Sequence, residues 1–259
     1  MLSVDTGFVF ALRQEAVGIL DRLKRVRTTC GDGLTFYTGN IGNISVAIVL
    51  SGIGQNNAEE AAKKLIDVFE PKSVCSAGYA GGLSARLKRF NICVPEQVLR
   101  GSGGEALDLS ETIPRKTAPM PDKFTLVTVN DVVETPVQKR ALRERTGAEI
   151  VDMETFAIAE VCRVRNVPFS SFRVVFDTES DQIPGDIAKI LGNMDKGISR
   201  LSGAIFGNIW SRPSVVLDFV SLKKRAFTAA ERLARFAITE LFQRRREQLK
   251  LPATETCRK

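Results

Sequence analysis

The spacing of hydrophobic positions between residues 153 and 177 predicts a helix that is followed directly by a strand. Apolar residues recur at helical intervals over 153–166, so one side of this helix should face a core. Pro168 ends the helix. Residues 169–176 are rich in β-branched and aromatic side chains, which is typical of a buried strand.

Acidic residues stand at both ends of this unit. Asp152 and Glu154 open the helix, and Asp177 follows the strand. Acids at a helix N-terminus can simply complement the helix dipole, and an Asp after a strand can simply cap a turn. In α/β proteins, however, ligands bind at the carboxyl ends of parallel strands. These carboxylates are therefore candidates for a site, and Glu15, at the junction of a predicted strand and helix, is another.

The first 190 residues continue this alternation of strands and helices. Further strands are predicted at 6–12, 34–39, 44–50, 73–78, 90–99 and 125–129, and further helices at 13–24, 57–69 and 135–146. A polar segment at 100–123 should be a long surface excursion. The alternation predicts an α/β fold with a mostly parallel sheet flanked by helices.

Two glycine-rich segments follow predicted strands. SGIG at 51–54 precedes a helix and has the Gly-x-Gly spacing that can cradle an anion, but it lacks the third glycine of a dinucleotide-binding fingerprint. GYAGGL at 78–83 is predicted as a turn. There Gly78 would let the backbone approach a ligand, and Tyr79 would cover a sugar or base. A plain tight turn is the alternative.

The composition excludes several kinds of active site. The chain contains no histidine, which excludes Ser-His-Asp and Cys-His nucleophile pairs and histidine-ligated metals. The five cysteines lack CxxC spacing, which suits a reducing cytoplasm and argues against zinc or a disulfide framework. The sequence also has neither an apolar run long enough to span a membrane nor a secretory signal. We expect no metal and no cofactor, so carboxylates must carry any proton transfer in a hydrolytic enzyme.

The positive charge lies in the C-terminal tail. Eleven basic and five acidic residues between 213 and 259 account for +6 of the net charge of +7. The tail also has an apolar stripe at helical spacing, formed by Val216, Phe219, Val220, Phe227, Ala230, Leu233, Ala234, Ala237 and Leu241. It is either a helix packed on the domain or on a partner subunit, or an interfacial helix that contacts an anionic membrane through 213–247. Packing is the commoner use of such a stripe, and no motif supports nucleic-acid binding.

Five segments together resemble the purine nucleoside phosphorylase and nucleosidase superfamily, and most of all its methylthioadenosine/S-adenosylhomocysteine nucleosidase branch. They are FALRQEA (10–16), SGIGQNNA (51–58), SAGYAGGL (76–83), IVDMETFAIAEVC (150–162) and VPFSSFRVVFDTESD (167–181). The resemblance implies a three-layer α/β/α phosphorylase-type fold with a central twisted mixed sheet over residues 1–195. A basic amphipathic helical extension over 196–259 would follow. It also implies a homodimer or a larger homo-oligomer.

The resemblance implies roles for several residues. Asp177 matches the acid that protonates or hydrogen-bonds purine N7, and Glu15 the base that activates water. Glu154 matches the carboxylate that holds the ribose hydroxyls, and Met153 a residue that packs on the ribose. Further substrate-binding candidates are Val132 and Val133, which would line the base pocket, together with Asp152, Gly78, Tyr79 and Arg173.

This division of roles suits cleavage of an N-glycosidic bond. The sugar passes through an oxocarbenium-like state, and an anionic purine is a poor leaving group. An acid with a raised pKa helps the base to leave, while a carboxylate on the opposite face orients water. Neither step needs histidine or a metal.

The sequence departs from the family pattern at several positions. Asp152 replaces a usual Glu, Phe176 a small polar residue, and Tyr79 a usual Ser or Thr. Ser76 stands where hexameric phosphorylases have a phosphate-binding arginine. Water is therefore favoured over phosphate as the acceptor, although Arg13 could serve a phosphate.

The tail, with its turn at 212–213 and basic helix, is similar to the C-terminal extension of hopanoid-associated phosphorylases. From the five segments we expect a cytoplasmic enzyme that hydrolyses an adenine nucleoside, and peripheral association at the inner membrane face is the alternative use of the tail. The alternatives are phosphorolysis of a lipid-linked adenosine and a non-catalytic nucleoside-binding protein.

Overall fold

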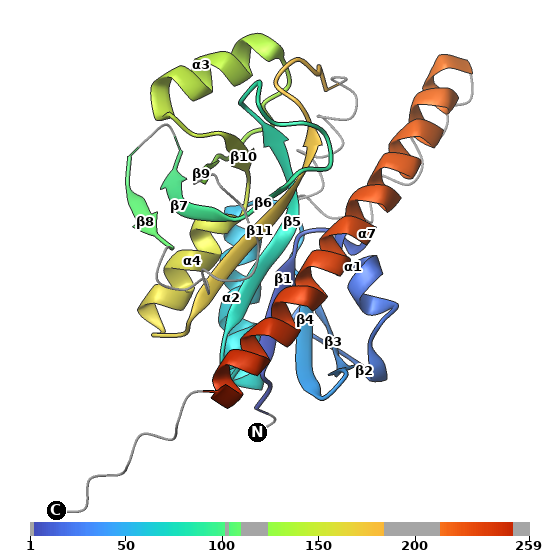
Figure 1. Ribbon diagram of the computed structural model, residues 1–259, viewed down its shortest axis with the longest axis vertical. Coiled ribbons are helices and arrows are strands. Elements are labelled where there is room, and N and C mark those ends of the chain that lie inside the picture. The colour runs from blue at the N-terminus through green and yellow to red at the C-terminus, as the bar shows by residue number, and fades with distance from the viewer. Residues whose placement is uncertain (1–2, 102–103, 110–123, 184–212, 251–259) are drawn as a thin grey trace, which may run out of the picture.

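A mixed β-sheet covered by helices on both faces forms the body of the protein (Figure 1). The computed structural model describes residues 3–101, 104–109, 124–183 and 213–250. The strands are β1 (Thr6–Phe10), β2 (Lys24–Gly31), β3 (Leu34–Ile41), β4 (Ile44–Leu50), β5 (Val74–Gly82), β6 (Ile92–Cys93), β7 (Pro95–Arg100), β8 (Ala106–Asp108), β9 (Phe124–Thr128), β10 (Ile150–Asp152) and β11 (Phe169–Asp177). The helices are α1 (Arg13–Leu20), α2 (Gln55–Phe69), α3 (Pro136–Thr146), α4 (Thr155–Val164) and α7 (Pro213–Lys250).

Strand β5 is the centre of the sheet. The strand order is β2-β3-β4-β1-β5-β10-β9-β7-β8, and β11 leaves this path to pair with β5 and β6. One edge of β5 pairs with β11 along nearly its whole length. The other edge pairs with β1 at residues 74–76 and then, antiparallel, with β10 at residues 81–82. Between these partners, residues 77–80 have no neighbour among the described strands on that edge, so an opening remains in the sheet.

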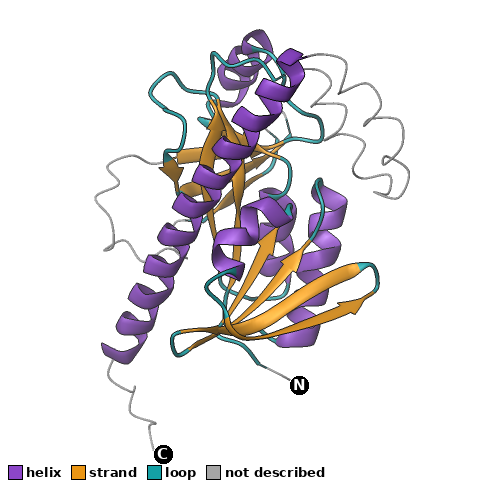
Figure 2. Cartoon of the chain, turned by 90° about the vertical axis from the view of Figure 1, so that its right-hand side faces the viewer, coloured by secondary structure: helices purple, strands orange, loops and turns teal. Residues whose placement is uncertain are grey.

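Two apolar clusters lie on opposite faces of this sheet. One includes Leu65 of α2 and Phe156 of α4, and these two helices pack against each other. The other includes Ile19 of α1 and Leu233 of α7, which also form a packed pair. Figure 2 shows helices on both sides of the strands, with α7 as the long helix that runs diagonally across the molecule. The predicted three-layer α/β/α fold is thus confirmed.

Helix α7 is packed onto the domain rather than standing apart from it. Within the predicted stripe, Ala230, Leu233, Ala234, Ala237 and Leu241 are all buried. Phe227, by contrast, is 68% exposed. The side chains of 216, 219 and 220 lie outside the described residues, as does the predicted domain boundary at 195/196. Over 229–241, the stripe therefore serves packing on the domain.

The contact between α7 and α1 is close. A side-chain carbon added to Gly18 would lie 2.7 Å from Cβ of Ala234 and 2.9 Å from the carbonyl oxygen of Ala230. Beside this contact, Arg22 forms an ion pair with Glu231 at 2.6 Å. The tail is thereby fixed to the helix that carries Glu15.

Three predictions about the elements were wrong. The helix predicted over 13–24 ends at Leu20, and β2 begins at Lys24. All eight residues of β2 are exposed, so the strand shows no alternation of apolar and polar positions that would identify it. The glycine turn predicted at 78–83 is instead the second half of β5, where β11 and β10 supply hydrogen-bonding partners. The sheet is mixed rather than mostly parallel, because short connections create antiparallel pairs such as β2–β3 and β7–β8.

Candidate active site

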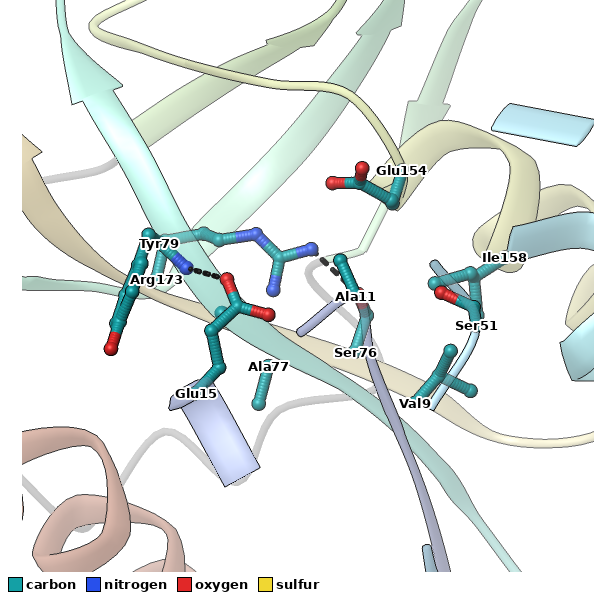
Figure 3. A pocket seen from close by; sticks show the side chains of 11 residues that line it. Val9, Ala11, Glu15, Ser51, Ser76, Ala77, Tyr79, Glu154, Ile158 and Arg173 are labelled. Atoms are coloured by element: carbon teal, nitrogen blue, oxygen red, sulfur yellow. Dashed lines mark hydrogen bonds between the residues drawn. The ribbon is translucent and has the colours of Figure 1, made fainter. Parts of the chain in front are cut away.

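A small pocket lies at the opening in the sheet beside β5. Residues from β1, α1, β5, α4 and β11 and from the connections beside them converge on it, and Figure 3 shows their side chains. Its lining comprises Val9, Ala11, Glu15, Ser51, Ser76, Ala77, Gly78, Tyr79, Glu154, Ile158 and Arg173. Five of the predicted site residues are therefore brought together here: Glu15, Gly78, Tyr79, Glu154 and Arg173.

Glu15 closes the gap in the edge of β5. It lies in the first turn of α1, where one carboxylate oxygen accepts a hydrogen bond from the N–H of Leu12 at 2.9 Å. The other oxygen accepts from the N–H of Tyr79 at 2.8 Å, in place of a neighbouring strand. Glycine at position 78 makes room for this carboxylate, because a side-chain carbon there would lie 2.8 Å from the Glu15 oxygen. The residue thus both caps its helix and lines the pocket.

Burial raises the pKa of Glu15, although its two backbone hydrogen bonds and Arg173 oppose the shift. A carboxylate with a raised pKa is a stronger base than one in water. A group of this kind is suited to accepting a proton from a bound water.

Glu154 is the second carboxylate of the pocket. It precedes α4, and one of its oxygens accepts a hydrogen bond from the N–H of Gly54 at 2.8 Å. The Gly-x-Gly segment before α2 thus donates a backbone hydrogen bond to a carboxyl group of the protein itself. Burial raises the pKa of Glu154 to about 8, and the charges of Asp152 and Glu15 add to the shift.

Arg173 is held by Asp152 beneath the pocket. Both side chains are buried, and the guanidinium approaches a carboxylate oxygen of Asp152 at 2.8 Å. The same guanidinium nitrogen donates to the hydroxyls of Ser76 and Thr155 at 2.6 Å each. Asp152 also accepts a hydrogen bond from the hydroxyl of Thr128 at 2.7 Å. The charge of Arg173 is thus balanced within the protein, and Asp152 lies behind the pocket rather than in its lining.

Asp177 lies at the end of β11 and does not line this pocket. It is close to Gly81 of β5, where an added side-chain carbon would lie 3.3 Å from its carboxylate. Its other neighbour is Lys139 of α3, which is fully buried and forms an ion pair with it. Burial raises the pKa of Asp177, while the charge and the hydrogen bond of Lys139 oppose the shift.

Two of the departures from the family pattern contact each other. The rings of Tyr79 and Phe176 are stacked, with centroids 4.9 Å apart and an interplanar angle of 16°. The hydroxyl of Tyr79 donates to the backbone carbonyl of Ala226 in α7 at 2.9 Å. The tail helix therefore reaches a residue of the pocket lining.

Three further predicted residues lie outside the lining. Met153 is half-buried beside Glu154. Val132 and Val133 are half-buried in the connection between β9 and α3, and Val133 packs on a separate apolar cluster around Leu142. Lys139 was not predicted, since a lysine in a polar helix has no local feature that marks it as buried.

No group of three or more metal-ligating side chains occurs within the described ranges. Likewise, none of the helices in that part of the chain has an apolar stretch long enough to cross a bilayer. The two basic side chains described above, Arg173 and Lys139, both pair with carboxylates.

The sequence and the fold both have relatives of known kind. The family model of the phosphorylase superfamily matches residues 6–124 and 122–205. A 5′-methylthioadenosine/S-adenosylhomocysteine nucleosidase from Buchnera aphidicola is 27% identical over 195 residues, covering 66% of this chain and 77% of that protein. Its counterpart from Oceanobacillus iheyensis is 23% identical over 218 residues, covering 75% and 95%.

Solved structures show the same fold. The futalosine hydrolase of Helicobacter pylori superposes with a TM-score of 0.70 at 17% identity, over 92% of this chain and 97% of that one. The 5′-methylthioadenosine/S-adenosylhomocysteine nucleosidase of Neisseria meningitidis, in complex with methylthio-immucillin-A, gives 0.69 at 18% identity, over 92% and 98%. Because the family model covers most of the chain, the protein belongs to the phosphorylase superfamily and is an enzyme of the nucleosidase or nucleoside phosphorylase kind.

Proposed function

We propose that the protein hydrolyses the N-glycosidic bond of a purine nucleoside, with adenine as the preferred base. The observation that carries this proposal is the position along β5 of two carboxyl groups, one buried and one half-buried. Glu15 is in contact with Gly78, and Asp177 lies against Gly81. Three residues of a strand span roughly 10 Å. That spacing suits a base and an acid that act on opposite sides of one bond.

In the proposed reaction the bond between C1′ of the ribose and N9 of the purine breaks. Glu15 takes a proton from water as the water oxygen bonds to C1′. Asp177 gives a proton or a strong hydrogen bond to N7, so that the base leaves without a full negative charge. Glu154 binds the ribose hydroxyls, and in its ionised form its carboxylate favours the positive charge that develops on the sugar.

Water is the proposed acceptor because the pocket disfavours phosphate. The lining contains two carboxylates, Glu15 and Glu154, and one basic side chain, Arg173. Since Asp152 already pairs with Arg173, the lining formed by the described residues has no uncompensated positive charge for a phosphate dianion. Arg13, the alternative phosphate ligand, donates to the hydroxyl of Tyr37 at 2.7 Å. We keep phosphorolysis as the second outcome of the test below.

The named relatives suggest the substrates for this test. Base release is measured from methylthioadenosine, S-adenosylhomocysteine, adenosine, inosine and futalosine, each with and without phosphate. Release that needs no phosphate, is lost in Asp177→Asn, and falls by about a hundredfold or more in Glu15→Gln would support the proposal. Glu144→Gln, at an exposed position, is the matched control.

Phosphate-dependent release with formation of a ribose 1-phosphate would favour phosphorolysis instead. Tight nucleoside binding with no release would favour a binding protein. Release from inosine or futalosine but not from the adenosine derivatives would overturn the adenine preference alone. A cytoplasmic location and assembly as a homodimer are further parts of the proposal, and fractionation and light scattering test them.

A further inference from the structure

Lys139 is a fully buried lysine whose three donors are all used. Its ammonium group pairs with Oδ2 of Asp177 and donates to the backbone carbonyls of Thr178 at 2.7 Å and Asp181 at 2.9 Å. A lysine ammonium has three N–H donors and no acceptor. With all three engaged inside the protein, Lys139 has none left for a substrate, and it must act through the groups it holds.

These contacts fix the segment that carries Asp177. Lys139 lies in α3, while its acceptors lie at the end of β11 and in the turn that follows. The same turn is closed by Asp181, whose carboxylate accepts from the N–H of Thr178 at 2.7 Å and pairs with Arg89 at 2.7 Å. A single buried side chain thus connects α3 to both ends of the turn.

We propose that Lys139 is a positioning residue that orients Asp177 and sets the pH range over which the Asp177 carboxyl holds its proton. This inference rests on the proposed function, in which Asp177 acts on the purine base. Lys139 occupies Oδ2 of the carboxyl group. Within the described residues, Oδ1 has no hydrogen-bonding partner. The geometry therefore leaves Oδ1 as the oxygen that meets the base.

The sign of the electrostatic effect follows from the neighbouring charges. Lys139, Asp181 and Arg89 are the charged groups that act on Asp177. A positive charge in contact favours the ionised carboxyl, whereas burial favours the protonated form. When the charge of Lys139 is removed, its lowering effect on the pKa of Asp177 is lost, and the raising effect of burial remains. Asp177 should then keep its proton to higher pH, and the fall of the hydrolysis rate at high pH should move upward.

Lys139→Met tests this directly, because methionine is of similar length and has no charge. The titration of the Asp177 carboxyl is followed by carbon-13 NMR, with its signal identified by its loss in Asp177→Asn. We expect the pKa of Asp177 to rise by about one unit or more, within the range typical of a lost ion pair. The high-pH limb of the kcat profile should rise with it. Arg140→Met, which removes an exposed charge from the same helix, should change neither.

An unchanged titration of Asp177 in Lys139→Met would overturn the proposal. If that variant does not fold, Lys139→Arg decides, because arginine keeps the charge but alters the geometry. There we expect kcat to fall at least about tenfold with little change in KM. A wild-type kcat would overturn the positioning role. The NMR titration needs no turnover, so it still decides the inference if the wild-type protein releases no base and the proposed function fails.

Discussion

Gly18 of α1 and Ala234 of α7 are in such close contact that a side-chain carbon on Gly18 would lie 2.7 Å from Cβ of Ala234. Real carbon atoms do not approach so closely, so the two helices can pack at this distance only with small residues at both positions. Because α1 also carries Glu15, the contact links the C-terminal helix to the candidate base.

Ala234→Leu should therefore destabilise the protein. The larger side chain has no room between α1 and α7, and overpacking of this kind costs about 1–3 kcal/mol. Urea unfolding measures the loss. Ala141→Leu, at an exposed position of helix α3, is the matched control and should change the stability little. Equal stability of the two variants would show that α1 and α7 can move apart at little cost in free energy.

Because the pKa of Glu154 is raised, the stability of the protein should depend on pH. Its pKa is about 8 in the folded protein against an ordinary value of 4.5. Between these values the folded state retains a proton that the unfolded state has released, so the free energy of unfolding falls as the pH rises through this window. Glu154→Gln has no such proton to lose. Relative to the wild type, the free energy of unfolding of this variant should increase by about 1.4 kcal/mol or more between pH 5 and pH 8. This change corresponds to a pKa difference of at least one unit between the folded and unfolded states.

Unfolding titrations at several pH values check this prediction. The control is Glu144→Gln, whose exposed side chain should leave the slope of stability against pH as in the wild type. A Glu154→Gln slope that matches the wild type would show that the raised pKa does not govern stability. Above pH 8 the same variant should bind nucleosides more weakly, because its amide lacks the charge that the ionised carboxylate offers to the ribose hydroxyls.

The sequence predicted most of the fold because its elements bury one regular face. The helix of α4 and the strand β11 were recognisable from apolar spacing alone, and five short motifs identified the superfamily. Strand β2 was missed because all its residues are exposed and no apolar alternation marks it. The glycines of β5 were predicted as a turn, because glycine usually weakens a strand and only the neighbouring β10 and β11 stabilise this one.

The candidate site was less accessible to prediction than the fold. Glu15, Glu154 and Arg173 could be named from motifs, but their meeting in one pocket depends on the gap between β1 and β10 along β5. Lys139 could not be named, because in the sequence it resembles the exposed Arg140 beside it. Which charged residue of a helix is buried depends on the rotation of that helix in the fold, and an i,i+3 partner as ordinary as Leu142 does not reveal it.

Substitutions of Arg173 and Asp152 should change the free energy of unfolding in a non-additive way. Arg173→Met leaves Asp152 as a buried carboxylate without its partner, which costs about 3–5 kcal/mol. Adding Asp152→Asn removes the unpaired charge while an amide oxygen can still accept from Thr128. The double variant should therefore be more stable than Arg173→Met alone. Urea unfolding of the two single variants and the double variant gives the coupling. Additive losses would mean that the pair contributes no specific interaction.

We expect any contact of the tail with a membrane to be electrostatic, without insertion of α7 into the bilayer. The apolar side chains at 230, 233, 234, 237 and 241 are buried on the domain, so they cannot enter a bilayer while the protein is folded. The exposed side of α7 instead presents Lys224, Arg225, Arg232 and Arg235, next to the exposed Phe227. Contact with anionic lipid would then depend on these charges and weaken with salt.

Sedimentation with vesicles of phosphatidylserine and phosphatidylcholine measures this contact. Lys224→Gln combined with Arg225→Gln should reduce binding severalfold without changing stability, since both side chains are exposed. Arg140→Gln combined with Arg145→Gln removes the same charge from exposed positions of α3 and is the control. An equal loss in both pairs would mean that net charge, and not the tail, attracts the membrane. Binding that persists in high salt would mean that apolar groups enter the bilayer, which requires part of α7 to leave its place on the domain.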